Sequence, residues 1–260
     1  MRRPPLATAA VALVVALAGC GSAGTGGEPG AAPLRVEVLE RLPHDPDLFT
    51  QGLEVAGDEL YEGTGRPGES RVRASSLDDG RVLREVALPA PLFGEGITVV
   101  DDTVWQLTWQ DGIAVERDRA TLAERRTVPY EGEGWGLCSD GDRLVMSDGS
   151  PRLSFRDPTT FEVIGGVDVR RDGEPVEELN ELECVDGAVW ANVWRTDEIV
   201  RIDPATGAVT GVVDAAGLLP QPDAAGADVL NGIAALPGTD EFLVTGKWWP
   251  ALFRVRFVEA

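Results

Sequence analysis

A short segment recurs five times along the chain, and this repeat constrains the fold more than any other feature of the sequence. Each copy is followed by a turn and a short alternating apolar run such as Asp58-Glu59-Leu60-Tyr61, which is the pattern of a β-strand. The period is about 45 residues, which favours propeller blades over helical repeats, because sustained helical periodicity is missing. Aligned on a leucine or isoleucine, the copies are Gln51-Gly52-Leu53, Glu95-Gly96-Ile97, Trp135-Gly136-Leu137, Asn180-Glu181-Leu182 and Asn231-Gly232-Ile233.

A hairpin turn completes each of the first four units. Two examples are Asp157-Pro158-Thr159-Thr160-Phe161 and Asp203-Pro204-Ala205-Thr206-Gly207. Proline presets its own backbone torsion and glycine accepts a positive one, so both residues favour tight turns. Alternating apolar residues flank each turn, which gives four strands per unit. The sequence therefore predicts an all-β fold, a five-bladed β-propeller of four-stranded antiparallel blades.

The fifth unit ends after residues 251–255 without an outermost strand, and an unassigned strand stands at the other end of the chain, at residues 34–43. That N-terminal segment resembles the outer strand of the first unit, residues 82–89, down to the final proline. We expect the N-terminal strand to complete the last blade and close the ring, which also removes an unpaired sheet edge.

Residues 1–19 are predicted to be a signal peptide of the lipoprotein type. Arg2 and Arg3 precede an apolar stretch that is shorter than the roughly 20 residues of a membrane-spanning helix. The stretch ends in Leu17-Ala18-Gly19-Cys20, which resembles a bacterial lipobox, so Cys20 is the expected lipidation site. The alternative is an ordinary secretory signal with an incidental cysteine. We expect an exported lipoprotein of the cell membrane that faces the extracytoplasmic side, or otherwise a secreted or periplasmic protein.

Residues 20–33 are predicted to be a flexible tether, and residues 34–260 the propeller domain. After Cys20 the tether contains only Gly, Ala, Ser, Thr, Glu and Pro, which have nothing to bury. The chain has 23 basic and 44 acidic residues and a net charge of −21. This charge argues against nucleic acid or anionic lipid as a partner. We therefore expect contact with the membrane only through the lipid anchor, and a monomer.

Two cysteines, Cys138 and Cys184, remain besides Cys20. Export permits a disulfide between them, but they occupy slightly different phases of neighbouring repeats. Two buried free thiols are therefore the favoured interpretation, and the disulfide is the alternative. Their spacing does not resemble a zinc site.

The repeats place polar and aromatic residues at one mouth of the central channel. In a propeller the innermost strand of each blade lines the channel, so the residues that begin these strands should form a ring there. The ring consists of Gln51, Glu95, Trp135, Asn180 and Asn231. A second equivalent position, after the following strand, holds Gly65, Trp109, Gly149, Trp194 and Lys247. Phe49 and Phe93 each stand two residues before a ring position, so the mouth resembles a small-ligand site.

Each of these residues also has a structural interpretation. Tryptophans often fill the space between blades, and an amide at a strand start commonly bonds backbone groups in turns, so Asn231 in particular could be structural. Glu95 is harder to explain in this way, because a carboxylate among aromatic residues is desolvated, which raises its pKa and suits proton transfer. Lys247 is the only lysine, and arginine's planar fork is no equivalent of its compact ammonium.

The single histidine, His44, excludes a multi-histidine metal site, and its position between Pro43 and Asp45 favours a turn-stabilising role over catalysis. No cofactor is expected to be required. Carbonyl groups of the inner strands could nevertheless form an oxygen cage for a structural calcium in the channel.

Several ordered motifs resemble the plant and bacterial glutaminyl-peptide cyclotransferases, and the resemblance extends from residue 34 to the C-terminus. The motifs are Phe49-Thr50-Gln51-Gly52-Leu53-Glu54, Tyr61-Glu62-Gly63-Thr64-Gly65, Phe93-Gly94-Glu95-Gly96-Ile97, Glu133-Gly134-Trp135-Gly136-Leu137, Leu179-Asn180-Glu181-Leu182-Glu183 and Leu230-Asn231-Gly232-Ile233-Ala234. That family is a five-bladed propeller unrelated to the zinc-dependent animal enzyme. Membership would imply cyclisation of the N-terminal glutamine of peptides or proteins to pyroglutamate, with release of ammonia and without a metal ion.

The resemblance also implies roles for individual residues. Glu95 matches the proposed catalytic acid, and Lys247 and Asn180 match pocket residues that would assist it, with Lys247 either stabilising the oxyanion or pairing with Glu95. Substrate-binding positions of the family correspond to Gln51, Phe49, Phe93, Trp109, Trp135 and Trp194. The alternative function is a tethered, non-catalytic propeller that binds peptide N-termini or a small ligand. A propeller hydrolase or lactonase would need several carboxylates around a calcium ion, and this ring offers mainly Glu95.

Overall fold

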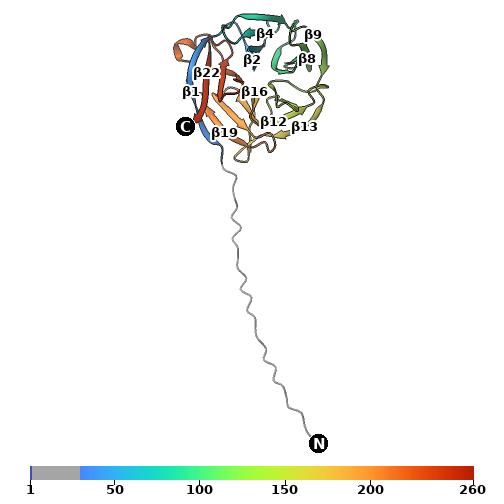
Figure 1. Ribbon diagram of the computed structural model, residues 1–260, viewed down its shortest axis with the longest axis vertical. Coiled ribbons are helices and arrows are strands. Elements are labelled where there is room, and N and C mark those ends of the chain that lie inside the picture. Colours follow the sequence, from blue (N-terminus) through green and yellow to red (C-terminus); the bar gives the residue numbers. More distant parts are fainter. Residues whose placement is uncertain (2–29) are drawn as a thin grey trace.

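The computed structural model describes Met1 and residues 30–260 and shows a ring of five four-stranded antiparallel blades (Figure 1). The predicted signal peptide, Cys20 and most of the predicted tether fall within residues 2–29, outside the described residues. From the channel outward, blade 1 consists of β2 (Thr50–Ala56), β3 (Glu59–Thr64), β4 (Arg71–Ser76) and β5 (Val82–Ala87). Blade 2 consists of β6 (Gly94–Val100), β7 (Thr103–Thr108), β8 (Ile113–Asp118) and β9 (Glu124–Pro129).

The remaining blades repeat this order. Blade 3 consists of β10 (Leu137–Ser139), β11 (Leu144–Met146), β12 (Arg152–Arg156) and β13 (Val163–Asp168). Blade 4 consists of β16 (Leu179–Val185), β17 (Ala188–Val193), β18 (Glu198–Ile202) and β19 (Val209–Asp214), and blade 5 of β20 (Leu230–Ala235), β21 (Glu241–Gly246), β22 (Ala251–Glu259) and β1 (Ala32–Pro43). A short hairpin of β14 (Arg170–Arg171) and β15 (Glu174–Pro175) lies between blades 3 and 4. The predicted fold class is confirmed.

The N-terminal strand closes the ring as predicted, and it also pairs with a strand of the neighbouring blade. β1 pairs antiparallel with β22 from Leu34 opposite Glu259 to Pro43 opposite Ala251, and the two strands lie side by side in Figure 1. It begins at Ala32, two residues before the expected domain boundary, and its first residues pair in parallel with β19. This pairing joins blades 4 and 5 into one eight-stranded sheet, which repeat counting alone did not predict.

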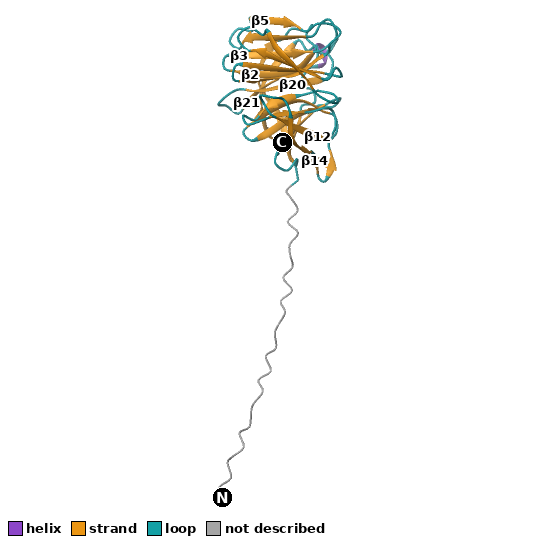
Figure 2. Ribbon diagram, turned by 90° about the vertical axis from the view of Figure 1, so that its right-hand side faces the viewer, coloured by secondary structure: helices purple, strands orange, loops and turns teal. Residues whose placement is uncertain are grey.

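Helix is almost absent from the described residues (Figure 2). They contain one short 3₁₀ helix, η1 (Gln221–Asp223), between β19 and β20. Residues 30–260 include no helix with the length and apolar character needed to cross a bilayer.

Burial decreases from the channel to the rim of each blade. The inner strand β6 is almost wholly buried, whereas the outer strand β9 is mostly exposed. Between blades the space is filled by large apolar side chains. Trp105 of blade 2, for example, is fully buried and lies 4.9 Å, centroid to centroid, from the ring of Phe161 of blade 3. Burial of such a side chain stabilises the fold by about 1.5–3 kcal/mol, so this tryptophan has the structural role that tryptophans commonly have in propellers.

The glycine of the repeated segment lies where neighbouring inner strands approach backbone to backbone. A Cβ atom on Gly136 would lie 2.1 Å from the backbone oxygen of Asn180, so any larger residue would force the two strands apart. This close approach explains the recurrence of the glycine at Gly52, Gly96 and Gly136, whereas Gly232 is required by its positive φ of 122°.

Glu181 is the one exception to that glycine, and its side chain links three blades. Its carboxyl oxygens accept hydrogen bonds from the backbone N–H groups of Leu53 at 3.1 Å and Ile233 at 2.8 Å, in blades 1 and 5. Burial raises the pKa of Glu181 well above its ordinary value, and the pKa of nearby Glu183 is also well raised, chiefly by burial. The repeat assigned no role to Glu181, although the break in the glycine pattern marked it.

The structure contradicts the favoured interpretation of the cysteines, because Cys138 and Cys184 form a disulfide between β10 and β16. Their Cα atoms are 5.4 Å apart, within the normal span of a disulfide. The phase comparison failed because the two cysteines differ in phase by only one residue. Cys138 follows the aligned Leu137 by one residue and Cys184 follows the aligned Leu182 by two, and a disulfide spans this offset between the neighbouring inner strands.

His44 ties blade 5 to blade 1. Its Nδ1 atom lies 2.8 Å from the backbone oxygen of Trp249, and its Nε2 atom lies 3.2 Å from Oε1 of Glu62. Burial alone would lower the pKa of His44, but the adjacent carboxylate of Glu62 raises it above its ordinary value. The side chain thus has the structural role expected from the sequence.

Candidate active site

One cavity of about 450 Å³ contains all nine predicted site residues other than the lipidation site. They are Gln51, Glu95 and Asn180, the aromatic residues Phe49, Phe93, Trp109, Trp135 and Trp194, and Lys247. Sequence reasoning missed Arg195, Asp228 and Val229, which also line the cavity and which stand beside the aligned repeat positions, not at them.

The repeat explains why these residues meet. Ring residues such as Gln51 and Glu95 stand at the second position of their inner strands. Trp109, Trp194 and Lys247 directly follow the second strand of their blades, which returns to the same mouth. The hairpins of blades 2 and 4 therefore each deliver one residue from the start and one from the end, whereas the hairpins of blades 1, 3 and 5 each deliver one of the two aligned residues.

An amide orients the acid of the site. Gln51 Nε2 donates a hydrogen bond of 2.9 Å to Oε1 of Glu95. Asn231 Nδ2 in turn lies 3.4 Å from Gln51 Oε1 and donates to the backbone oxygen of Thr50 at 3.0 Å. Because Asn231 is fully buried and does not line the cavity, its predicted place in the ring needs correction. It lies behind Gln51, which supports the structural interpretation of this residue.

The pKa values of Glu95 and Lys247, two of the ionisable groups that line the cavity, are shifted in opposite directions. Burial raises the pKa of Glu95 well above its ordinary value, the positive charge of Lys247 opposes this shift, and the negative charge of Glu133 adds to it. Burial lowers the pKa of Lys247, against the charges of Glu95 and Asp228. The ammonium nitrogen of Lys247 lies 4.9 Å from the centroid of the Phe49 ring, in cation–π range. Burial thus brings the pKa values of the acid and the amine closer together, and such perturbed pairs cluster at functional sites.

Asn180 presents an unused acceptor. Its Oδ1 atom is buried and has no hydrogen-bond partner among residues 30–260, and the residue is only 4% exposed. The backbone of Asn180 is fixed by a hydrogen bond, because Ser147 Oγ donates to its carbonyl oxygen at 2.7 Å. Because a buried acceptor without a donor costs about 1–3 kcal/mol, this atom is suited to accept from an N–H group of a bound ligand.

Aromatic rings form the wall of the mouth. One series of edge-to-face contacts runs from Trp248 to Phe49, Phe93 and Trp109, with centroid distances of 4.7, 6.2 and 5.6 Å. A separate pair, Trp135 and Trp194, is 5.4 Å apart. Glycine at the second repeat position makes room for a ring, because a Cβ atom on Gly149 would lie 2.7 Å from the indole of Trp135.

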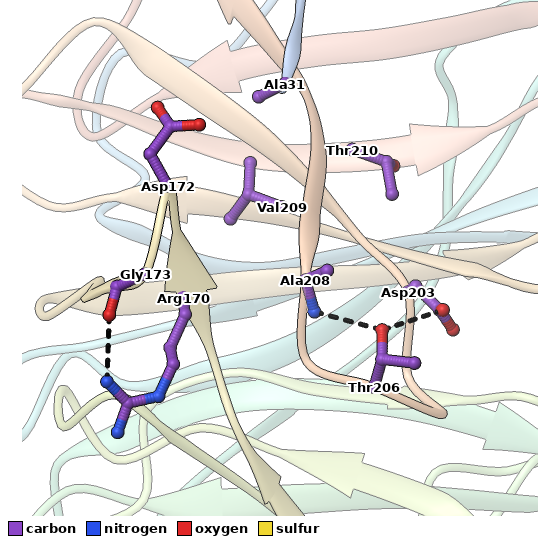
Figure 3. A pocket seen from close by; sticks show the side chains of 9 residues that line it. All are labelled: Ala31, Arg170, Asp172, Gly173, Asp203, Thr206, Ala208, Val209 and Thr210. Atoms are coloured by element: carbon purple, nitrogen blue, oxygen red, sulfur yellow. Dashed lines mark hydrogen bonds between the residues drawn. The ribbon is translucent and has the colours of Figure 1, made fainter. Parts of the chain in front are cut away.

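A second cavity, of about 550 Å³, lies where the β14–β15 hairpin meets the turn before β19 (Figure 3). Its polar groups bond one another: Arg170 Nη1 donates to the Gly173 oxygen at 3.0 Å, and Thr206 Oγ1 donates to Asp203 Oδ2 at 2.8 Å. None of its charged side chains is buried. This cavity therefore lacks the desolvated groups that catalysis needs.

Residues 30–260 contain no group of three or more His, Cys, Asp or Glu side chains placed to hold a metal ion.

The fold and the site together define a β-propeller with a small-ligand cavity at the mouth of its channel, in which a buried acid and a buried amine face an aromatic wall. A sequence profile of the glutamine cyclotransferase family matches residues 10–257. A glutaminyl-peptide cyclotransferase of Arabidopsis thaliana is 39% identical over 230 residues, which are 86% of this chain and 72% of the plant protein. The chain belongs to the glutamine cyclotransferase family, so the resemblance found in the sequence and the enzyme class that it implies are confirmed.

Solved structures agree with this assignment. The crystal structure of Myxococcus xanthus glutaminyl cyclase matches with a TM-score of 0.82 at 37% identity, covering 88% of this chain and 99% of that chain. A β-propeller domain from Myceliophteria thermophila matches with a TM-score of 0.50 at 10% identity over 85% of this chain and 99% of its own, and that likeness shows the fold alone.

Proposed function

We propose that this chain is a glutaminyl-peptide cyclotransferase that converts the N-terminal glutamine of peptides and proteins to pyroglutamate by acid–base catalysis without a metal ion. The observation that carries the proposal is the state of Glu95. It is buried, oriented by Gln51 and placed in a cavity of a size and aromatic character that suit a glutamine side chain.

The reaction joins two groups of one molecule. The α-amine of the substrate attacks the carbon of its own side-chain carboxamide, and the bond from that carbon to the amide nitrogen then breaks. Because both groups are already linked, a site that holds the side chain folded back removes most of the remaining entropic barrier. The aromatic wall holds the methylene groups and excludes water, while Asn180 Oδ1 accepts a hydrogen bond from the amine or the carboxamide.

One carboxyl group, that of Glu95, carries the proton from the attacking amine to the departing nitrogen. The attacking amine loses one proton to Glu95, and Glu95 returns it to the departing nitrogen, which leaves as ammonia. The raised pKa of Glu95 suits this exchange, because it makes the carboxylate a stronger base toward the attacking amine. Lys247, whose ammonium is close to the wall residue Phe49, donates to the oxygen that becomes negative in the tetrahedral intermediate.

Mass spectrometry of a Gln-Xaa peptide incubated with the purified protein tests the proposal, because cyclisation removes one ammonia from its mass. Glu95→Gln should lower the rate by roughly 100- to 10,000-fold without loss of the fold. Turnover close to that of the unmodified protein in this variant would refute the role of Glu95. Peptide binding without any mass change would instead establish the non-catalytic binder.

The same assay tests metal independence. Activity should survive dialysis against a strong chelator, and a loss that zinc or calcium restores would contradict the proposed mechanism. A structural calcium in the channel would appear as a chelator-dependent drop in thermal stability with activity retained at low temperature.

We also propose that the protein is exported and anchored through a lipid on Cys20, on the sequence of residues 1–20 alone. The expressed protein should partition into detergent, and Cys20→Ser should release it into the aqueous phase. Equal partitioning of both forms would exclude the lipid anchor. Size-exclusion chromatography with light scattering of the released domain tests the expected monomer.

A further inference from the structure

Glu133 contacts two of the tryptophans that line the cavity, and the proposed reaction does not yet use it. Its Oε2 atom accepts hydrogen bonds from the indole nitrogens of Trp109 at 2.7 Å and Trp135 at 2.9 Å. Its Oε1 atom accepts from Nε2 of Gln110 at 2.8 Å. One carboxylate in the loop between β9 and β10 thus binds three N–H donors from two blades.

The position of Glu133 in the aromatic wall gives these bonds their importance. Edge-to-face contacts run from Trp248 as far as Trp109, and the pair formed by Trp135 and Trp194 stands apart. Among residues 30–260 no ring contact joins Trp109 to Trp135, and the Glu133 carboxylate occupies the junction between them. Trp109 is 38% exposed, so neighbouring side chains alone do not fix its ring.

We propose that Glu133 is a positioning residue of the cyclisation, which fixes the planes of Trp109 and Trp135 so that the wall closes around the substrate's glutamine side chain. This inference rests on the proposed function. Glu133 does not line the cavity and acts only through the two indoles. An ionised carboxylate suits the role because it has acceptor sites for all three donors and offers none of its own.

The charge state of Glu133 agrees with this geometry. Burial opposes ionisation of Glu133, but the hydrogen bonds from Trp135, Gln110 and Trp109 lower its pKa below the ordinary value. Its negative charge also adds to the raised pKa of Glu95. Glu133 therefore influences the cavity in two ways, through the wall and through the acid.

Glu133→Gln is the sharpest probe, because glutamine keeps the size of the side chain but has one acceptor oxygen and directs an NH₂ group at an indole donor. The wall holds the substrate in the ground state and in the transition state alike, so KM should rise while kcat changes little. The expected rise is roughly ten-fold, the size of one lost hydrogen bond to a charged group. The acidic limb of the kcat/KM profile should move to lower pH, because Glu95 loses a neighbouring negative charge.

Glu131→Gln is the matched control, since Glu131 is an exposed acid of the same loop whose side chain forms no hydrogen bond with another side chain among the described residues. It should leave KM, the pH profile and tryptophan fluorescence unchanged. Glu133→Asp should recover part of the loss, because it keeps the charge at a shorter reach. Thermal unfolding of each variant confirms that the fold is intact.

The proposal is overturned if Glu133→Gln and Glu131→Gln have the same KM, even where their fluorescence differs. If the unmodified protein shows no turnover, the proposed function fails on its own. In that case the affinity for a Gln-Xaa peptide, measured by tryptophan fluorescence titration, replaces KM. An equal affinity in both variants would then overturn the positioning role.

Discussion

The propeller should lose stability as the pH rises from 5 to 8, because several of its buried acids hold protons that the unfolded chain releases. Burial raises the pKa of Glu54 from 4.5 to about 7, and it raises those of Glu181 and Glu183 well above their ordinary values. His44, whose pKa is raised by Glu62, acts in the same direction. In this window the folded state binds more protons than the unfolded state, so the free energy of unfolding falls as the pH rises.

The pKa shift of Glu54 gives the size of this fall in the free energy of unfolding. A shift from 4.5 to about 7 corresponds to a loss of about 3 kcal/mol, which begins above the pKa of the unfolded chain and is complete once the pH has passed the folded pKa. Aspartates with lowered pKa values, such as Asp45, act near and below their ordinary pKa and leave this window unaffected. The other buried acids have the same sign and add to the loss, whereas Lys247, whose pKa is lowered by burial, acts in the opposite direction as its pKa is approached.

Urea unfolding followed by tryptophan fluorescence at pH 5, 6, 7 and 8 measures the effect. Glu54→Gln should flatten the dependence, because glutamine does not titrate and keeps an acceptor for the backbone N–H of Val99, which Glu54 Oε2 binds at 2.9 Å. Stability that is constant or rises over this range would refute the reasoning. An unchanged slope in Glu54→Gln would assign the effect to other groups.

Two further predictions concern single contacts. Lys247→Arg should lower kcat/KM by roughly 100-fold with the fold intact, because the planar guanidinium cannot replace a compact ammonium beside Phe49, and full activity would mean that charge alone suffices. Replacing Cys138 and Cys184 by serine should reduce the free energy of unfolding by roughly 4 kcal/mol, from the entropy of a loop with a sequence separation of 46 residues, as measured by urea unfolding. Reactive thiols at both positions in the unreduced protein would contradict the disulfide.

The fold could be predicted from sequence because the repeat is visible both in the inner strands and in the turns. Inner strands need glycine at close approaches, as at Gly136, and the turns need Asp, Pro and Gly, so the blades can be counted along the chain. The parallel pairing of β1 with β19 and the disulfide could not be predicted in this way. Both are contacts between neighbouring blades, which an alignment of repeats does not contain.

The site was predictable to the same extent. Residues at equivalent repeat positions, such as Glu95 and Lys247, do meet in one cavity. The sequence did not predict the contacts of Glu133 with the two tryptophans, because they depend on how its loop folds. Its position two residues before Trp135 was nevertheless a signal that the two side chains could interact. Arg195 follows an aligned position directly and could have been found by extending the repeat by one residue.

Two buried acids of this ring, Glu95 and Glu181, show what separates a catalytic carboxyl from a structural one. Both have strongly raised pKa values caused by burial, so the pKa alone would nominate both as catalytic. They differ by one position in the repeat. Glu181 stands at the glycine position, and both of its oxygens accept from backbone N–H groups. Glu95 stands one position earlier and lines the cavity, and among residues 30–260 only Gln51 bonds it, through Oε1. Its Oε2 atom is therefore the one carboxyl oxygen of the pair left to exchange a proton with a substrate.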